Sequence, residues 1–418
     1  MPRPRLLFLC HTLPYPPDLG AHIRTYNTLR LLAREFRITM LCCYRRQDRP
    51  TAADVENGLA ELRKLVDEVY AFPVEQTLSR SRFVSDHVRS LVHRRPYTEY
   101  VYESGAFRRQ LDAALASGPF DLVHIDSLDL AGYLGNFEPA MVVCVHHNVE
   151  SQLLRRRAEG ERSPLARRYI LYQADRVEEL ERHWCGRFAL NIAVSEHDRR
   201  ELQMLSKSAR FLVVPNGVDT RQFLVHEGPQ RGMVFVGGTQ WFPNRDALVH
   251  FADDILPRLR ERGVDEPVAW VGRASEPMIR HYGEEYGIHL TGYVPDIRPY
   301  VDAAACYVVP LRIGGGTRLK ILDAWASGKA IVSTSIGCEG LDARDGENIL
   351  IRDDPDSFAD AVKSVLLDPD LRRRLGRAAR QTAESTYDWE VIGREMVQSY
   401  HAIIANRNTR PALSSTAV

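Results

Sequence analysis

Short apolar segments rich in β-branched residues alternate along the chain with longer segments whose apolar residues recur at helical spacing. Continuous apolar segments are typical of parallel strands that are covered on both faces. Strand and helix alternate in this way through both halves of the chain, which predicts two doubly wound α/β domains. The expected strands are residues 5–10, 37–43, 120–125, 141–147 and 189–195 in the first half, and 210–215, 232–237, 267–272, 305–311 and 329–334 in the second.

The domain boundary is expected in the polar, charged stretch 195–210. Near the end of the chain, residues 389–403 carry a full apolar stripe at helical spacing, which predicts a helix that packs back across the domain junction. The final residues are polar and small, and such termini are commonly disordered. We therefore assign residues 1–200 to an N-terminal domain and residues 201–386 to a C-terminal domain. Residues 387–406 are expected to form the crossover helix, and residues 407–418 a disordered tail.

Composition narrows the class of protein. The 418 residues are 44% apolar and 26% charged, as in ordinary globular enzymes. Lys and Arg balance Asp and Glu at 55 each, so net charge gives no reason to expect a nucleic-acid partner. The seven cysteines lack the spacing of a zinc site or a disulfide framework, which favours the cytoplasm. No apolar segment reaches the roughly 18 residues of a membrane helix, so we expect any membrane contact to be peripheral.

Positive charge gathers in two segments of the N-terminal domain, residues 80–97 and 153–169. One interpretation is that both are solvated helix faces. The other is a surface for an anionic lipid or an anionic acceptor, which clusters of Lys and Arg on a helix favour. Both interpretations stay open at this point.

A glycine-rich turn follows the expected strand 305–311 and precedes a helical pattern that ends at Gly328. Ligands of open parallel sheets bind at the carboxyl ends of strands, and a helix N-terminus offers free N–H groups and partial positive charge. Glycines let an anion approach the backbone, and arginine binds phosphate with two hydrogen bonds. A carboxylate one turn later can accept hydrogen bonds from a ribose. A nucleoside diphosphate is therefore expected at Gly314, Gly315, Gly316, Thr317, Arg318, Lys320 and Asp323; the alternative is a plain turn before a basic surface helix.

These residues carry a resemblance to a known family. The segment PLRIGGGTRLKILDAWASGKAIVSTSIGCEGL, residues 310–341, resembles the donor-binding segment of retaining glycosyltransferases of the GT-B fold, family 4 type. The likeness extends over nearly the whole chain. It implies two Rossmann-like domains that face each other across a cleft, with the C-terminal helix crossing back. It also implies transfer of a sugar from a nucleotide diphosphate donor to an acceptor hydroxyl with retention. The further matching segments are 13–33, 146–151, 213–219, 235–248, 291–311 and 385–400.

The resemblance assigns roles in the first half of the chain. The loop and helix from Gly20 to Arg24 are expected to face the donor phosphates or the acceptor, the alternative being a simple strand–helix turn. In HHNVES, His147 resembles the family histidine that contacts the donor sugar, with Asn148 orienting it. His146, the preceding residue, competes for that role. A core histidine with backbone partners is the other interpretation of His147. Asn148 is also expected, with Gly20 and Arg24, to face the acceptor or the donor phosphates.

One position departs from the family pattern. The family often carries two glutamates separated by seven residues, and they fall here on Gly315 and Asp323. The carboxylate that usually contacts the donor sugar is therefore missing, and Glu339 is a candidate replacement by its proximity in sequence. Gly237 and Gly238, at the end of the expected strand 232–237, complete the expected donor-binding set.

Fixed positive charge and helix dipoles can stabilise a departing diphosphate without a metal. Two Asp-Pro-Asp sequences, residues 354–356 and 368–370, precede helical patterns, which favours helix capping over metal binding. We expect no metal and no other cofactor. The expected partners are a nucleotide sugar and a glycan or lipid-linked acceptor, in polysaccharide or glycolipid assembly. Two alternatives stay open: a GT-B nucleotide-sugar epimerase, and a catalytically silent nucleotide-sugar-binding protein, the latter because of Gly315.

Overall fold

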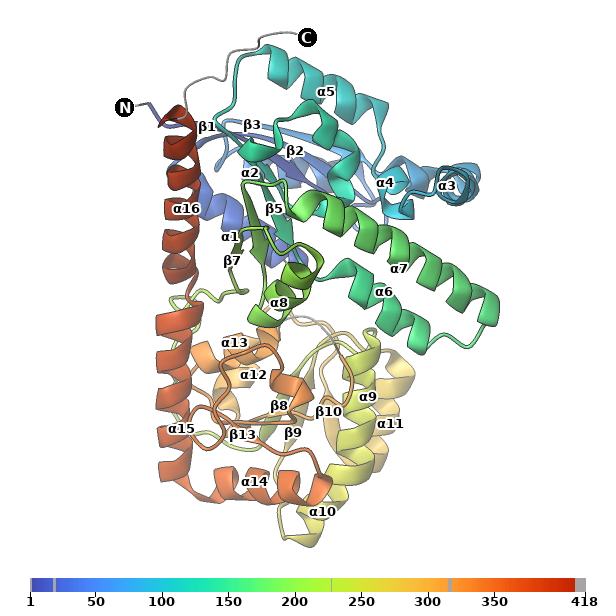
Figure 1. The fold of residues 1–418 in the computed structure, drawn as a ribbon. Coiled ribbons are helices and arrows are strands. Elements are labelled where there is room, and N and C mark those ends of the chain that lie inside the picture. Colours follow the sequence, from blue (N-terminus) through green and yellow to red (C-terminus); the bar gives the residue numbers. More distant parts are fainter. Residues whose placement is uncertain (1, 18–19, 227, 315–317, 410–418) are drawn as a thin grey trace, which may run out of the picture. The chain divides into compact units, whose positions relative to one another are not determined.

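The structure is a computed structural model that describes residues 2–17, 20–226, 228–314 and 318–409. The chain forms two compact units (Figure 1). The first combines the residues up to Pro215 with those from Gly393 onward, and the second runs from Asn216 to Ile392. In the described part of the chain, no helix combines the length and the apolar character needed to cross a membrane.

The first unit is built on a parallel sheet that has seven strands among the described residues. The strands are β1 Arg5–Cys10, β2 Arg37–Tyr44, β3 Glu68–Pro73, β4 Leu122–Ile125, β5 Val142–His146, β6 Leu190–Ala193 and β7 Phe211–Val213. Their order is β3-β2-β1-β4-β5-β6-β7, so the sheet grows in opposite directions from β1 and β4. Leu7 pairs with Thr39 on one side of β1, and Phe8 pairs with His124 on the other. β1 is buried from Leu6 onward, as its continuous apolar sequence requires.

Helices cover this sheet, and several begin at serines. Ser79, Ser104, Ser163 and Ser195 each accept a hydrogen bond from a backbone N–H in the first turn of the following helix. The helices are α1 Gly20–Leu32, α2 Ala52–Leu62, α3 Arg80–His93, α4 Tyr97–Val101, α5 Gly105–Ala116, α6 Glu150–Glu159, α7 Pro164–Cys185 and α8 Glu196–Leu205. The C-terminal helix α16, Trp389–Thr409, begins in the second unit and continues into the first.

The second unit has six parallel strands in its described part, in the order β10-β9-β8-β11-β12-β13. They are β8 Met233–Val236, β9 Val268–Val271, β10 Ile288–Leu290, β11 Cys306–Val309, β12 Ile331–Ser333 and β13 Leu350–Ile351. Asp354 and Asp368 cap two helices through their carboxylates, as the Asp-Pro-Asp pattern predicts. The helices are α9 Phe242–His250, α10 Leu256–Glu261, α11 Glu276–Tyr286, α12 Arg298–Ala303, α13 Leu319–Ala326, α14 Pro355–Leu367 and α15 Pro369–Thr382.

The structure corrects the sequence analysis at three places. The strand expected at 210–215 pairs with β6 as β7, so the first unit extends to Pro215 rather than ending within 195–210. Three strands, β3, β10 and β13, were not predicted. Helix α16 includes residues 407–409, which were expected in the disordered tail. The rest of that tail, 410–418, lies outside the described residues.

Candidate active site

The carboxyl ends of β8 and β11 lie side by side in the second sheet. From β8 the sheet grows toward β9 and β10, and from β11 toward β12 and β13, so their junction is the switch point at which open α/β sheets bind ligands. Gly237 and Gly238 follow β8, and Gly314 lies in the loop after β11. Gly315, Gly316 and Thr317, the centre of the predicted phosphate cradle, lie outside the described residues.

The loop after β8 needs glycine. Gly237 has φ 156°, and a Cβ atom there would lie 2.6 Å from Nδ2 of Asn244 and 2.9 Å from the Phe235 ring. The N–H of Gly237 donates to the carbonyl of Val271 at 2.7 Å, and Nδ2 of Asn244 donates to the carbonyl of Gly238 at 3.0 Å. Asn244 on α9 therefore fixes this loop at the switch point.

Arg318 occupies the position just before α13 and is buried. Its Nε and Nη2 atoms donate to the carbonyl of Ile336 at 3.2 and 3.1 Å. The Nη2 atom also lies 3.9 Å from a carboxylate oxygen of Glu339, and a Cβ atom at Gly314 would lie 2.9 Å from the guanidinium group. Burial lowers the pKa of Arg318, and the charge of Glu339 opposes that shift. The structure thus brings Gly314, Arg318 and Glu339 together.

Lys320 lies in the first turn of α13. Its Nζ atom donates to Oδ1 of Asn244 at 2.7 Å and lies 4.0 Å from the centroid of the Phe235 ring. Burial, with a smaller contribution from the charge of Arg318, lowers the pKa of Lys320 to about 7. A bound anion would favour the charged form. Asn244 therefore links Lys320 to the Gly237–Gly238 loop, a role that the sequence analysis missed.

Asp323 follows one turn later on the same helix. Burial raises the pKa of its carboxyl to about 7. Among the residues that the structure describes, none hydrogen-bonds this carboxylate or forms an ion pair with it. Asp323 is half-buried, and a carboxylate partly removed from water is more stable when a ligand supplies hydrogen-bond donors. The predicted ribose contact would supply them.

A second polar group lies in the first unit, where β1, β4 and β5 are neighbours. His11, Asp126 and His147 follow directly after these three strands. Nε2 of His147 lies 2.7 Å from the carbonyl oxygen of Asp126 and 3.4 Å from its Oδ2 atom. The rings of His147 and His11 pack edge to face with centroids 5.5 Å apart. The parallel strands therefore bring three titratable residues to one edge of the sheet.

Asp126 is buried and organises this group. Oγ1 of Thr25 donates to its Oδ2 atom at 2.5 Å, and Nε2 of His124 lies 3.5 Å from Oδ1. Burial alone would raise the pKa of Asp126, but the charges and hydrogen bonds of His147 and His124 outweigh burial and hold the pKa well below its ordinary value. Asp126 is thus a charged acceptor that orients His147.

The two histidines of HHNVES have different surroundings. His146 is buried, and its Nε2 atom lies 3.0 Å from Oδ1 of Asn191. Burial lowers the pKa of His146 to about 4, which keeps the ring neutral. The side chain of His147 is 15% exposed. The core interpretation therefore fits His146, whereas His147 remains open to a ligand.

The expectation that Asn148 orients His147 is wrong. The Asn148 amide donates to a carboxylate oxygen of Glu150 at 3.3 Å, and Asp126 holds His147 instead. Asp126 was missed, although it directly follows the buried strand β4, as His147 directly follows β5. A small cavity at this point is lined by Thr98, Ser127, Leu128, Asp129, Val145, His146, His147, Asn148, Glu150, Val177, Leu180 and Glu181.

Arg24 lies on α1, which begins at Gly20. The side chain is buried, and its Nη2 atom donates to the carbonyl of Val214 at 2.8 Å. Burial lowers the pKa of Arg24 to about 10, against the opposing charge of Asp126. The guanidinium group thus lies near Asp126 and the end of β7. The predicted contact of Gly20 and Arg24 with phosphate or acceptor stays a prediction.

Within the described residues, Cys10, His11 and Asp126 form one cluster with the chemistry of metal ligands. Metals bind the thiolate form of cysteine. Burial, and to a smaller extent the charge of Asp126, raise the pKa of the Cys10 thiol well above its ordinary value, which favours the protonated form. The donor set therefore fits a metal poorly, and the expectation of a metal-free enzyme stays a prediction.

Two family descriptions match most of the chain. Glycosyltransferase Family 4 matches residues 19–222, and Glycosyl transferases group 1 matches residues 230–368. The chain belongs to the family 4 glycosyltransferases. This confirms the family that the donor segment suggested.

The glycosyltransferase also resembles individual proteins. The phosphatidyl-myo-inositol mannosyltransferase of Mycobacterium tuberculosis is 25% identical over 317 residues, 71% of this chain and 78% of the relative. Sucrose-phosphate synthase of Thermosynechococcus elongatus is 16% identical, with a TM-score of 0.67 over 96% of this chain and 100% of the other. HepE of Anabaena in complex with UDP-glucose is 11% identical, with a TM-score of 0.61 over 95% and 99%. The glycosyltransferase therefore has the two-domain α/β GT-B fold predicted from its sequence.

Proposed function

We propose that this glycosyltransferase transfers a sugar, with retention at the anomeric carbon, from a nucleoside diphosphate donor to a hydroxyl group of a glycan or lipid-linked acceptor. The observation that carries the proposal is the placement of Arg318 just before α13, and of Lys320 and Asp323 in its first turns, at the switch point of the second sheet. The names of the relatives support it. One acts on phosphatidyl-myo-inositol, and the structure of another contains UDP-glucose. Polysaccharide or glycolipid assembly is the setting that these relatives favour.

The donor diphosphate would bind at the N-terminus of α13. Arg318 and Lys320 supply full positive charges, and the backbone of Gly314–Thr317 supplies the predicted cradle. When the bond between the anomeric carbon and the diphosphate oxygen breaks, negative charge develops on that oxygen. Fixed positive groups aimed at it lower the barrier. Because an anion raises the pKa of a neighbouring lysine, Lys320 would be charged in the donor complex at neutral pH.

The ribose and the sugar need polar partners of their own. Asp323 would accept hydrogen bonds from the ribose diol, which ends the isolation of its carboxylate. His147 would meet the donor sugar, with Asp126 fixing the ring through Nε2. Glu339, which lies 3.9 Å from Arg318, would replace the carboxylate that the family often has at the position of Gly315. Each of these contacts is part of the proposal.

Two other activities are compatible with the same residues. A nucleotide-sugar epimerase would bind the donor in the same way and return an isomeric nucleotide sugar. A silent binding protein would bind the donor and release nothing, and the glycine at position 315 favours this alternative. Both differ from a transferase in their products, because only a transferase releases a nucleoside diphosphate and a glycosylated acceptor.

A panel of nucleotide sugars tests the proposal. The enzyme is incubated with each donor, with and without glycan and lipid acceptors, and the released nucleoside diphosphate is measured. We expect release with one donor, acceleration by an acceptor, and a product whose anomeric configuration by NMR equals that of the donor. Binding without release would indicate a silent protein, an isomeric nucleotide sugar an epimerase, and an inverted product would contradict retention.

A further inference from the structure

Helix α3 turns its apolar side chains to solvent. Val84, Val88, Leu91 and Val92 are 60%, 52%, 50% and 71% exposed. Their spacing of four, seven and eight residues places them on one side of a helix. We call these four residues the α3 stripe. A surface helix normally buries such a stripe against the core, so the polarity of α3 is inverted.

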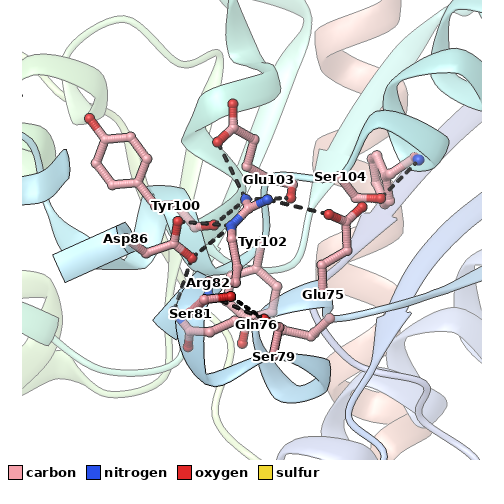
Figure 2. Close-up of polar contacts among 12 residues, drawn as sticks. Glu75, Gln76, Ser79, Ser81, Arg82, Asp86, Tyr100, Tyr102, Glu103 and Ser104 are labelled. Atoms are coloured by element: carbon pink, nitrogen blue, oxygen red, sulfur yellow. Dashed lines mark hydrogen bonds and ion pairs between the residues drawn. The ribbon is translucent and has the colours of Figure 1, made fainter. Parts of the chain in front are cut away.

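The opposite face of α3 is polar and buried. Asp86 and Ser90 are fully buried there. Arg82, one turn before Asp86, donates from Nε to its Oδ1 atom at 2.8 Å, and lies within 3.3 Å of Glu75 and 3.5 Å of Glu103 (Figure 2). These contacts hold the helix by its polar side. The outward direction of the stripe is therefore fixed by the fold.

A second set of contacts fixes the end of the helix. The Ser90 hydroxyl donates to the carbonyl of Arg95 at 2.7 Å and accepts from Nε2 of Gln173 on α7 at 2.9 Å. The same glutamine accepts from the backbone N–H of Tyr97 at 2.8 Å. Rotation of α3 that buried the stripe would break these bonds and leave Asp86 a buried charge without its partners, which is strongly unfavourable. The apolar face needs a partner from outside the described structure.

Charge around the stripe is positive. Residues 80–95 contain five arginines and a single acid, the buried Asp86. Arg82 and Arg89 pair with Asp86 and with Glu103 outside this segment, and Arg95 lies 3.8 Å from Glu99, so the positive charge that remains lies at the two ends of the helix. Arg80 at the start of α3 and Arg94 and Arg95 at its end are exposed. An apolar row between exposed arginines is complementary to a surface whose headgroups are anionic and whose interior is apolar. A 14-residue helix is about 21 Å long, too short to cross a bilayer but able to lie in its interface.

We propose that the α3 stripe docks the first unit onto an anionic lipid bilayer. The valines and the leucine enter the acyl boundary, while Arg80, Arg94 and Arg95 contact the headgroups. This goes beyond the proposed function, because docking requires neither donor nor acceptor. It would also bring a lipid-linked acceptor to the enzyme.

Vesicle co-sedimentation tests the proposal. The full chain is mixed with vesicles of phosphatidylcholine alone or with roughly one third phosphatidylglycerol, without nucleotide sugar. We expect sedimentation with the anionic vesicles, weakened by about 0.5 M salt because screening shortens electrostatic attraction. The double variant Val88→Gln, Val92→Gln should bind at least about tenfold more weakly, since it removes apolar burial. Glutamine is a good helix former, so α3 should keep its fold.

The matched control is Leu367→Gln, which changes a residue that is 68% exposed on α14 in the second unit. It should bind vesicles like the wild type. Circular dichroism and donor hydrolysis without vesicles should be the same for all three proteins. Wild-type protein that stays in the supernatant, or equal binding by the double variant, would overturn the proposal. A lipid-free dimer that the double variant converts to a monomer would assign the stripe to a second copy and overturn it as well.

Discussion

The hydroxyl group of Tyr400 lies 2.7 Å from Nδ1 of His124, which joins the C-terminal helix α16 to strand β4. On its other side His124 meets Asp126, with 3.5 Å between Nε2 and Oδ1, and Asp126 in turn holds His147. Tyr400, His124 and Asp126 are buried. A chain of polar groups therefore runs from α16 to the proposed catalytic histidine.

Removing the first group of this chain should destabilise the protein. Tyr400→Phe leaves Nδ1 of the buried His124 without its partner, which we expect to lower the free energy of unfolding by about 1–3 kcal/mol. Denaturant unfolding measures this. Tyr293→Phe, at a tyrosine that is 68% exposed, is the control and should change nothing. If the chain also positions His147, kcat should fall while KM stays constant. Equal stability of both variants would contradict the role of the hydroxyl.

Substitutions of His147 and His146 should have different effects, the first mainly on transfer and the second on stability. His147→Ala should slow transfer by about 10²-fold, the scale of one lost polar contact to the transition state. It should also lose some stability, because the buried Asp126 loses a partner, but the fully folded variant should still turn over slowly. His146→Ala leaves Oδ1 of the buried Asn191 without its partner and should cost about 1–3 kcal/mol of stability while the folded enzyme turns over normally. Steady-state kinetics and unfolding curves of both variants show which histidine contacts the substrate. The reverse pattern would move the substrate contact to His146.

Arg318, just before α13, and Lys320, in the first turn of α13, should act on the leaving group. Arg318→Ala and Lys320→Ala should each reduce transfer by about 10²-fold or more, because each removes charge from the developing anion. Donor release in the panel described above provides the assay. Arg280→Ala removes an exposed arginine on α11 and should retain full activity. Activity near that of the control in both α13 variants would contradict the assigned role.

Strand ends explain how much of the site the sequence could predict. In a parallel sheet, residues that follow a buried strand share one edge, and this rule located the turn that contains Gly314, whereas His147 was assigned by its resemblance to the family histidine. Bonds between distant elements gave no such signal. Asn244 lies 76 residues before Lys320, yet its amide binds both that lysine and the Gly238 carbonyl. The 21 residues between Asp126 and His147 likewise hide the pair that orients the histidine.

The strands of the fold were likewise predicted only where the local sequence pattern is strong. Strands with continuous apolar sequence were predicted, and the two-domain α/β architecture is confirmed. The missed strands carry weak patterns: β3 is EVYAFP, which includes a charge and a proline, β10 is the three residues IHL, and β13 is only LI. The basic character of residues 80–97 was visible in the sequence. The inverted polarity of α3 was not, because only the partners of Asp86 and Ser90 show which side faces inward.

The pH dependence of nucleotide binding follows from Lys320. Burial and the charge of Arg318 lower its pKa to about 7, whereas a lysine in the unfolded chain has a pKa of about 10.4. Between these values the folded protein binds fewer protons than the unfolded chain, so the contribution of Lys320 to stability improves as pH rises through this window. Binding of a diphosphate favours the charged form and should therefore take up a proton above pH 7.

The expected result is an affinity that falls by up to about tenfold per pH unit above about pH 7, until the pKa of the complex is reached. Titration calorimetry with the nucleoside diphosphate identified in the panel, in two buffers of different ionisation enthalpy near pH 8, measures the proton uptake. Lys320→Arg keeps its charge and should bind without this pH dependence. Burial also raises the pKa of Asp323 to about 7, and Asp323→Asn removes that titration while leaving the lysine effect above pH 7. A flat profile in the wild type, or uptake that persists in Lys320→Arg, would show that another group accepts the proton.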